Sequence, residues 1–318
     1  MKKIVVLSGK GGTGKTTISS SFASLMGESS KLNIADCDVE APNLHLMFKH
    51  ELIEQKEYYG VKCAVLNQDL CTNCKLCYEK CRFDAILLDK DENVVIDDLS
   101  CEGCGLCEYI CPVDAITMED ELTGHINSAK IENGYLSYAN LKIGAEGAGK
   151  VVTEVRKMAE GQKLQSNENE NEKSATNEKN EEFPYLLIDG SPGIGCVVIA
   201  SLTGCDYALV ITEPTQSGLS DLQRVVELIK FFNMPCYVII NKYDLNTDKT
   251  LEIENYVKKI KESDKDFNFD LEVVGKIPFD KSVSDAIQNE IPVVKYENSE
   301  AGRSIIQIWN ELSLKLNN

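Results

Sequence analysis

The chain has 318 residues, of which 43% are hydrophobic and 26% are charged, a composition typical of a folded globular protein. Its 51 acidic residues outnumber the 33 lysines and arginines, so the net charge is −18. This charge argues against nucleic acid and anionic membrane as partners, because both need a basic protein surface. No apolar run approaches the roughly 18 residues that cross a bilayer. The apolar run in the opening MKKIVVLSGKGG is too short for a signal peptide. We therefore expect a cytoplasmic protein.

The first 48 residues alternate apolar runs with helical patterns. Residues 2–8 predict a buried strand, and residues 14–28 predict a helix opened by a glycine-rich loop. Residues 31–38 predict a second strand that ends in acidic residues, and residues 41–48 predict a helix or loop. The alternation then stops.

Helical spacing returns at residues 149–164. Residues 165–182 are rich in Asn and Glu and contain no aromatic side chain, which predicts a disordered acidic loop. Beyond them, strands and helices alternate again. The predicted strands are 185–192, 208–214, 235–241 and 271–278, and the predicted helices are 216–232, 248–263 and 300–316.

Apolar strands separated by helices predict an α/β fold whose mostly parallel sheet is covered on both faces. We expect one P-loop domain formed by residues 1–59 and 121–318. The cysteine-rich residues 60–120 then form a small inserted α+β domain.

The sequence GKGGTGKT matches the phosphate-binding pattern G-x-x-x-x-G-K-[ST] between a predicted strand and a predicted helix. The glycines allow backbone N–H groups to point at phosphate oxygens. Lys15 is expected to reach the β- and γ-phosphates, and Thr16 to hold Mg²⁺. The predicted nucleotide-binding residues here are Gly9, Lys10, Gly11, Gly12, Thr13, Gly14, Lys15, Thr16 and Thr17.

The additional lysine after the first glycine, Lys10, makes this loop resemble that of the deviant Walker A ATPases. That family includes MinD, ParA, the nitrogenase iron protein and Mrp-type cluster carriers, and the resemblance covers about residues 1–48 and 140–318. It implies a nucleotide-dependent homodimer in which Lys10 contacts the nucleotide of the partner subunit.

Two acidic segments carry the same resemblance. ADCDVEAPNL resembles switch I, with Asp38 positioning the attacking water and Asp36 supporting the metal or the phosphate loop. LLIDGSPGIG resembles the Walker B strand and switch II, with Asp189 contacting Mg²⁺ through water. The alternative for Asp36 and Asp38 is a capped turn after a strand. The implied catalytic residues are Lys10, Lys15, Asp38 and Asp189, and the implied Mg²⁺ residues are Thr16, Asp36, Asp38 and Asp189.

Asn241 matches the position at which this family contacts the base. The sequence NKYD that it begins also fits the N-K-x-D pattern of guanine-binding GTPases, so GTP is an alternative. The Walker A lysines favour ATP. The resemblance adds Pro278, Phe279 and Asp280 as further base contacts.

Eight of the 13 cysteines form two C-x₂-C-x₂-C-x₃-C runs, the pattern of bacterial two-cluster ferredoxins. In that pattern the fourth cysteine of each run ligates the other cluster. The first predicted [4Fe–4S] site is Cys71, Cys74, Cys77 and Cys111, and the second is Cys101, Cys104, Cys107 and Cys81. Zinc is the alternative, since four cysteines also bind Zn²⁺.

Three further features of the cysteines matter. The second run ends in Cys-Pro, as the ferredoxin pattern expects, whereas Arg82 takes the place of proline in the first. Cys196 follows Asp189 by seven residues, and its resemblance to the nitrogenase iron protein raises the possibility of a cluster that bridges two subunits. The remaining cysteines are expected to be inert thiols.

Together these features predict an ATP-binding, ATP-hydrolysing iron–sulfur protein. Its nucleotide state would gate electron transfer from two [4Fe–4S] clusters to a redox partner, because the insertion lies between the two switch segments. An alternative is an ATPase for iron–sulfur or metallocofactor assembly, acting on an assembly partner. A third class is a ParA- or MinD-like positioning ATPase, against which the acidic charge argues.

Overall fold

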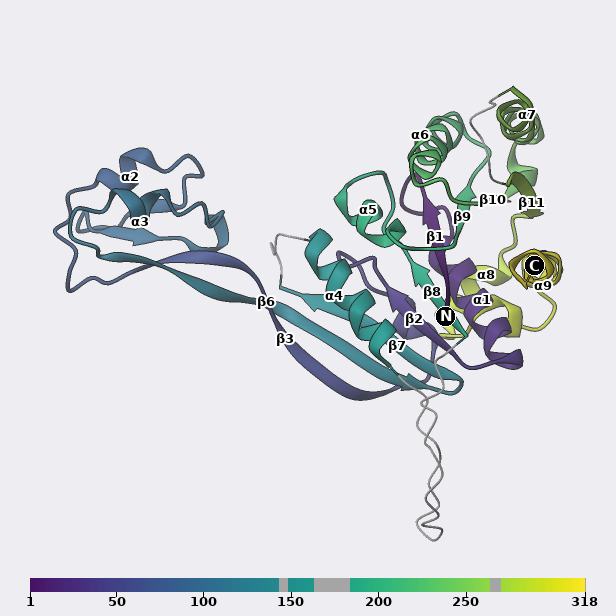
Figure 1. Cartoon of the computed structure of the whole chain (residues 1–318), viewed down its shortest axis with the longest axis horizontal. Coiled ribbons are helices and arrows are strands. Elements are labelled where there is room, and N and C mark those ends of the chain that lie inside the picture. The colour runs from purple at the N-terminus through teal and green to yellow at the C-terminus, as the bar shows by residue number, and fades with distance from the viewer. Residues whose placement is uncertain (143–147, 163–183, 264–269, 318) are drawn as a thin grey trace, which may run out of the picture. The chain divides into compact units, whose positions relative to one another are not determined.

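The computed structural model describes residues 1–142, 148–162, 184–263 and 270–317. The acidic segment 165–182 lies outside these residues. Within them, nine strands form one sheet in the order β11-β10-β9-β1-β8-β2-β7-β6-β3 (Figure 1). A separate pair, β4 (Ile86–Leu88) and β5 (Val94–Ile96), is antiparallel.

Six neighbouring parallel strands with short apolar sequences form one side of the sheet. Five of them are largely buried, and β11 is the edge strand. Each strand pairs in parallel with its neighbours, as in Val6 opposite Asp189 and Ser8 opposite Ile211. Parallel pairing brings the carboxyl ends of β1, β2 and β8 to one edge. The strands are β1 (Lys2–Ser8), β2 (Leu32–Asp36), β8 (Tyr185–Asp189), β9 (Tyr207–Thr212), β10 (Cys236–Asn241) and β11 (Leu271–Ile277).

Helices cover both faces of these strands (Figure 1). On one face α1 (Lys15–Ser29) packs against α9 (Glu300–Asn317), with the rings of Phe22 and Trp309 5.5 Å apart. The other helices are α4 (Ala148–Gly161), α5 (Cys196–Leu202), α6 (Gln216–Phe232), α7 (Thr247–Ser263) and α8 (Ser282–Gln288). α4 packs on α5 and on β2. The fold is therefore α/β with a largely parallel sheet.

Three strands that the sequence does not predict extend the sheet beyond β2. β7 (Gly134–Leu141) is parallel to β2, and β6 (Ile116–Ile131) and β3 (Glu51–Leu66) follow it. β3 and β6 have 16 residues each, and most side chains of β3 are exposed or half-buried. β3 has little buried surface and needs no apolar run, so the periodicity that reveals the central strands is missing there. β7 is buried along most of its length, but polar residues such as Ser137 interrupt its apolar sequence.

The described chain divides into two compact units. The larger consists of Met1–Gln55, Ile126–Ala139 and Ala148–Asn318, and the smaller is built mainly from Lys56–His125. β3 and β6 each contribute residues to both units. In the smaller unit, hereafter the cysteine unit, α2 (Leu76–Lys80) packs against α3 (Leu106–Ile110).

Candidate functional site

The phosphate loop connects β1 to α1 at the carboxyl edge of the sheet. Gly12 and Gly14 adopt left-handed conformations, with φ of 80° and 88°. No side chain caps the start of α1, and its first turn contains no acidic residue. Its first N–H groups can therefore bind an anion.

Asp189 is the central partner of the loop. Its carboxylate is fully buried and lies 2.9 Å from the Lys15 ammonium. The hydroxyl groups of Thr16 and Ser19 donate to its two oxygens at 2.8 and 2.7 Å. Asp38, just after β2, lies 3.7 Å from the same ammonium. The predicted acids and Lys15 thus form one charged cluster.

Asp36 is the last residue of β2, and it holds the segment that follows β2 by hydrogen bonds. Its carboxylate, also fully buried, accepts hydrogen bonds from the N–H groups of Asp38 and Leu44, both at 3.1 Å. Leu44 begins the short 3₁₀ helix η1 (Leu44–Met47), after which the chain enters β3. Asp36 therefore holds both Asp38 and the start of η1.

Burial and mutual repulsion change the acidity of these carboxyl groups. Burial, followed by the neighbouring Asp189 carboxylate, raises the pKa of Asp36 to about 7. Burial also raises the pKa of Asp38. Burial by itself would lower the pKa of Lys15, but the Asp189, Asp38 and Asp36 carboxylates outweigh it and raise that pKa. Lys15 is therefore a cation, whereas the Asp36 carboxyl group is about half protonated near pH 7.

The phosphate loop opens onto a cavity of about 420 Å³ in the larger unit. The Asn241 amide donates to the Thr13 carbonyl at 2.8 Å, which fixes the end of β10 against the loop. The Asp280 carboxylate instead accepts from Ser299 Oγ and Ala301 N, at 2.8 and 3.1 Å. Predicted residues that line this cavity are Gly11, Gly12, Gly14, Lys15, Thr16, Thr17, Asp38, Asn241, Pro278, Phe279 and Asp280.

Lys10 is held by residues of its own chain. Its ammonium lies 3.1 Å from Ser217 Oγ and 3.5 Å from Thr215 Oγ1, at the start of α6. Glu213 lies 3.8 Å away and accepts from Lys242 at 2.6 Å through its other oxygen. Lys10 is thus tied to the connection between β9 and α6.

The phosphate loop has an unpaired buried hydroxyl group and open backbone positions, both of which suit a bound phosphate. The Thr13 hydroxyl is buried without a hydrogen-bond partner, which is costly unless a ligand supplies one. A Cβ atom added to Gly11 or Gly12 would meet nothing within 4 Å, so a ligand can approach that backbone. Together with the Lys15 cluster, these groups fit a nucleotide with Mg²⁺.

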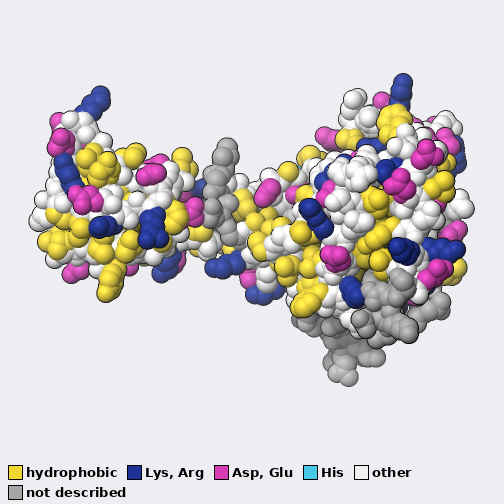
Figure 2. All heavy atoms as spheres, turned by 90° about the horizontal axis from the view of Figure 1, so that it is seen from above, with side chains coloured by type: hydrophobic (Ala, Val, Ile, Leu, Met, Phe, Trp, Pro, Cys, Tyr) yellow, Lys and Arg dark blue, Asp and Glu magenta, His cyan; other side chains and the backbone are white. Residues whose placement is uncertain are grey.

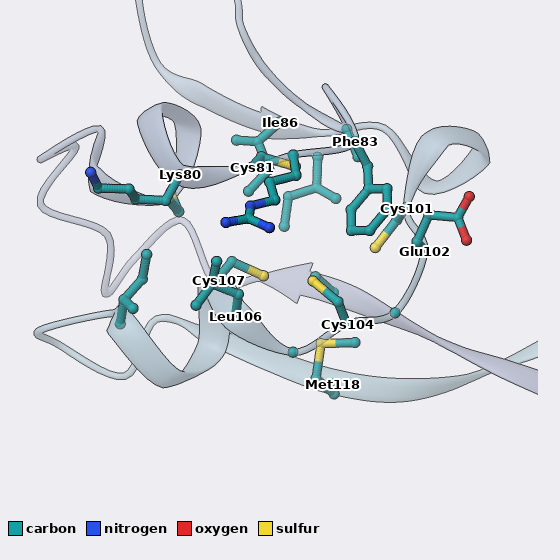
Figure 3. A pocket seen from close by; sticks show the side chains of 18 residues that line it. Lys80, Cys81, Phe83, Ile86, Cys101, Glu102, Cys104, Leu106, Cys107 and Met118 are labelled. Atoms are coloured by element: carbon teal, nitrogen blue, oxygen red, sulfur yellow. The ribbon is translucent and has the colours of Figure 1, made fainter.

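The eight clustered cysteines line two cavities of the cysteine unit, and Cys77 lines both. Cys81, Cys101, Cys104 and Cys107 line a cavity of about 290 Å³, into which their side chains converge (Figure 3). A smaller cavity, of about 20 Å³, is lined by Cys71, Cys74, Cys77 and Cys111. We call them the larger and the smaller cysteine cavity.

The two cysteine runs repeat the same backbone conformation. Asn73 and Lys75 in the first run, and Gly103 and Gly105 in the second, all have left-handed φ angles. Backbone N–H groups of Asn73 and Ala115 donate to the sulfur atoms of Cys71 and Cys111, at 3.4 and 3.2 Å. Both sulfur atoms line the smaller cavity, and such donors are typical of iron–sulfur ligand loops. The predicted set of four cysteines at each cavity is the donor set that a [4Fe–4S] cluster takes, so the residue types fit. Among the described residues, no group of three or more His, Cys, Asp and Glu side chains could hold a single metal ion.

Two other cysteines have notable surroundings. Cys196 is exposed at the start of α5, where a Cβ atom on Gly149 would lie 3.5 Å from its sulfur. Cys63 is buried on β3, and its thiol donates to the Ala64 carbonyl at 3.7 Å. Its neighbour Lys62 packs tightly on the ligand loop, because a Cβ on Gly103 would lie 2.3 Å from the Lys62 carbonyl oxygen.

Comparison with known proteins agrees with the nucleotide site. Residues 4–293 match the family described as the CobQ/CobB/MinD/ParA nucleotide binding domain. The chain belongs to this family. The Uncharacterized protein MJ0578 of Methanocaldococcus jannaschii is 32% identical over 98% of this chain and 96% of its own. An iron–sulfur cluster carrier protein of Pyrococcus furiosus is 24% identical over 42% of this chain and 47% of its own.

Solved structures of MinD share the fold of this CobQ/CobB/MinD/ParA family member. The septum site-determining protein MinD of Pyrococcus horikoshii, complexed with Mg-ADP, aligns with a TM-score of 0.54 and 19% identity over 98% of this chain and 95% of its own. A chain of the MinC:MinD complex of Aquifex aeolicus aligns with 0.52 and 18% identity over 98% and 96%. At these identities the likeness is one of fold.

Sequence reasoning missed some residues of the nucleotide site. Ser19 binds Asp189, and a run of three serines after the phosphate loop was its only signal. Glu213 joins Lys10 to Lys242, which no local pattern indicates because the three come from separate strand ends. None of the described helices has the length and hydropathy of a membrane span.

Proposed function

We propose that this family member is an ATP-binding and ATP-hydrolysing iron–sulfur protein, in which nucleotide state gates electron transfer from two [4Fe–4S] clusters. The clusters accept electrons from a one-electron donor and pass them to a partner protein. The supporting observations are the nucleotide-sized cavity, the two cysteine cavities and the segment that joins Asp36 to β3.

In the nucleotide half, Lys15 and the N–H groups at the start of α1 bind the phosphates. Thr16 and Asp189, now hydrogen-bonded at 2.8 Å, are the groups that would hold Mg²⁺. When bound, Mg²⁺ neutralises charge that develops on the phosphate oxygens. Asp38 orients the water that attacks the terminal phosphate, and the products are ADP and phosphate. Asn241 and Pro278–Asp280 contact the base.

The observation that carries the gating proposal is the double hydrogen bond of Asp36. The same carboxylate holds the N–H of Asp38, next to the phosphates, and the N–H of Leu44, at the start of η1. From η1 the chain continues into β3, which supplies residues to the cysteine unit. A displacement of Asp36, whose neighbour Asp189 is one of the residues that would hold Mg²⁺, would move both Asp38 and the start of η1.

In the cysteine half, Cys71, Cys74, Cys77 and Cys111 would hold one cluster. Each cluster supplies a one-electron redox centre, which is chemistry that no side chain here provides. The second set is Cys81, Cys101, Cys104 and Cys107.

The proposed partners are a second copy of this chain and a redox protein. In the homodimer, Lys10 would leave its contacts with Ser217 and Glu213 and bind the nucleotide of the other subunit. Exposed apolar side chains on the cysteine unit offer a protein-binding surface (Figure 2). They are Tyr78, Phe83, Leu99, Leu106, Tyr109 and Val113. Basic side chains are scattered on the face drawn in Figure 2, which supports neither nucleic acid nor membrane as the partner.

The partial similarity to iron–sulfur cluster carrier proteins favours a second candidate, an assembly ATPase for which the cluster is cargo. That similarity extends over 42% of this chain or less. A bridging cluster at Cys196 would belong to the same candidate.

The decisive experiment measures reoxidation of the dithionite-reduced protein, prepared anaerobically, by a one-electron acceptor protein with ATP, with ADP and without nucleotide. The proposal expects the rate to change with nucleotide, and the Lys15→Ala variant, at equal iron content, to lose the dependence. Equal rates in all three states would refute the gating. Transfer of ⁵⁵Fe-labelled cluster to an apo-protein would instead favour assembly.

A further inference from the structure

The two cysteine cavities differ at one equivalent position. The residue after the fourth cysteine of each run lines a cavity: Pro112 lines the smaller, and Arg82 lines the larger. The backbones of the two runs are otherwise alike, since Asp84 and Asp114 share left-handed φ angles of 54° and 52°. The repeat therefore places a cation at one site where the other has a neutral ring.

We infer that Arg82 gives the cluster held by Cys81, Cys101, Cys104 and Cys107 a higher reduction potential than its counterpart at the smaller cavity. This inference rests on the proposed function, because it requires both clusters. A positive charge beside a cluster stabilises the state that carries the additional electron. An electron that enters the cysteine unit is then held by the cluster at the larger cysteine cavity, and the cluster at the smaller cavity stays oxidised.

Other charges near the cavities do not cancel this difference. Lys75 lines the smaller cavity, but its ammonium pairs with Glu92 at 2.7 Å. At the larger cavity, the charged ends of Lys80 and Glu102 both extend away from the cysteine thiols (Figure 3). Arg82 is thus the cavity-lining charge that distinguishes the two sites.

Hydrogen bonds to sulfur also raise cluster potentials. At the smaller cavity, the backbone N–H groups of Asn73 and Ala115 donate to Cys71 and Cys111. These donors are neutral dipoles, whereas Arg82 carries a full positive charge, so we expect the charge to decide the order. Arg82 is exposed, so salt should weaken its effect.

The test is an EPR-monitored redox titration of the full chain, prepared anaerobically with iron and sulfide counted. The wild-type protein should show two one-electron steps. Arg82→Gln should lower the reduction potential of the higher-potential step by at least about 28 mV. This corresponds to a threefold change in the equilibrium constant for reduction, at 59 mV per tenfold. Arg82→Pro, which copies Pro112, should do the same. Lys80→Gln, the matched control, should shift it less than half as far, and 1 M salt should reduce the difference between wild type and Arg82→Gln.

Each outcome has a distinct meaning. Two clusters with equal potentials in the wild type, or an unchanged upper step in both Arg82 variants, would overturn the inference and leave the proposed function intact. An equal shift of both steps would also overturn it. Fewer than about eight iron atoms per chain, four for each cluster, would overturn the proposed function itself and the inference with it.

Discussion

Replacing Asp36 by asparagine should change how the stability of the protein depends on pH. Asp36 is fully buried, and burial together with the Asp189 carboxylate raises its pKa from 3.8 to about 7. Between these values the folded protein keeps a proton that the unfolded chain releases. The free energy of unfolding contributed by Asp36 therefore falls as the pH rises from about 4 to 7.

The size of this effect follows from the two pKa values. They are about three units apart, and each unit corresponds to about 1.4 kcal/mol, so Asp36 costs about 4 kcal/mol at pH 8 relative to pH 4. The amide of the Asp36→Asn variant has no such titration. Its single carbonyl oxygen leaves one of the N–H groups of Asp38 and Leu44 without its acceptor, a cost of about 1–3 kcal/mol that does not vary with pH.

Urea unfolding from pH 5 to 8, without nucleotide or Mg²⁺, measures the difference. Trp309 is the one tryptophan of the chain and packs on Phe22 in the larger unit, so its fluorescence reports unfolding of the nucleotide site. Relative to wild type, the Asp36→Asn variant should gain about 3 kcal/mol between pH 5 and pH 8, because about two of the three pKa units lie in that window. If the free energy of unfolding of the two proteins changed with pH in parallel, the raised pKa of Asp36 would be refuted.

Three further substitutions test the nucleotide site. Lys15→Ala should lower ATP hydrolysis at least about hundredfold, because it removes the cation that binds the phosphates, with iron–sulfur absorbance unchanged; equal loss of both would indicate misfolding. Lys10→Ala should bind nucleotide but hydrolyse it at least about tenfold more slowly, and full activity would exclude its role in the partner subunit. Gly14→Ala should lower the free energy of unfolding by about 1–2 kcal/mol or more, because φ at Gly14 is 88° and the added Cβ would lie 2.4 Å from Asn241 Nδ2. Gly161→Ala is the control, because a Cβ there would meet nothing within 4 Å.

Much of the nucleotide site could be predicted because its parts are local. A glycine loop between a strand and a helix positions Lys15 and Thr16 whatever surrounds it, and acids that end buried parallel strands meet at one edge. Lys10 could be recognised as well, but its contacts with Ser217 and Glu213 could not. They join strand ends that lie about two hundred residues apart in sequence.

The sequence by itself determined the phosphate loop, the central parallel strands and the spacing of the cysteines, since each depends on short-range geometry or on a continuous apolar run. Only the tertiary structure revealed β3, β6 and β7, because the largely exposed β3 has no apolar pattern and polar residues such as Ser137 interrupt the sequence of the buried β7. It alone showed that Asp36 holds Leu44, and that Arg82 and Pro112 occupy matching places in two cavities. Those contacts depend on which chain segments pack together, and packing is decided by the whole fold.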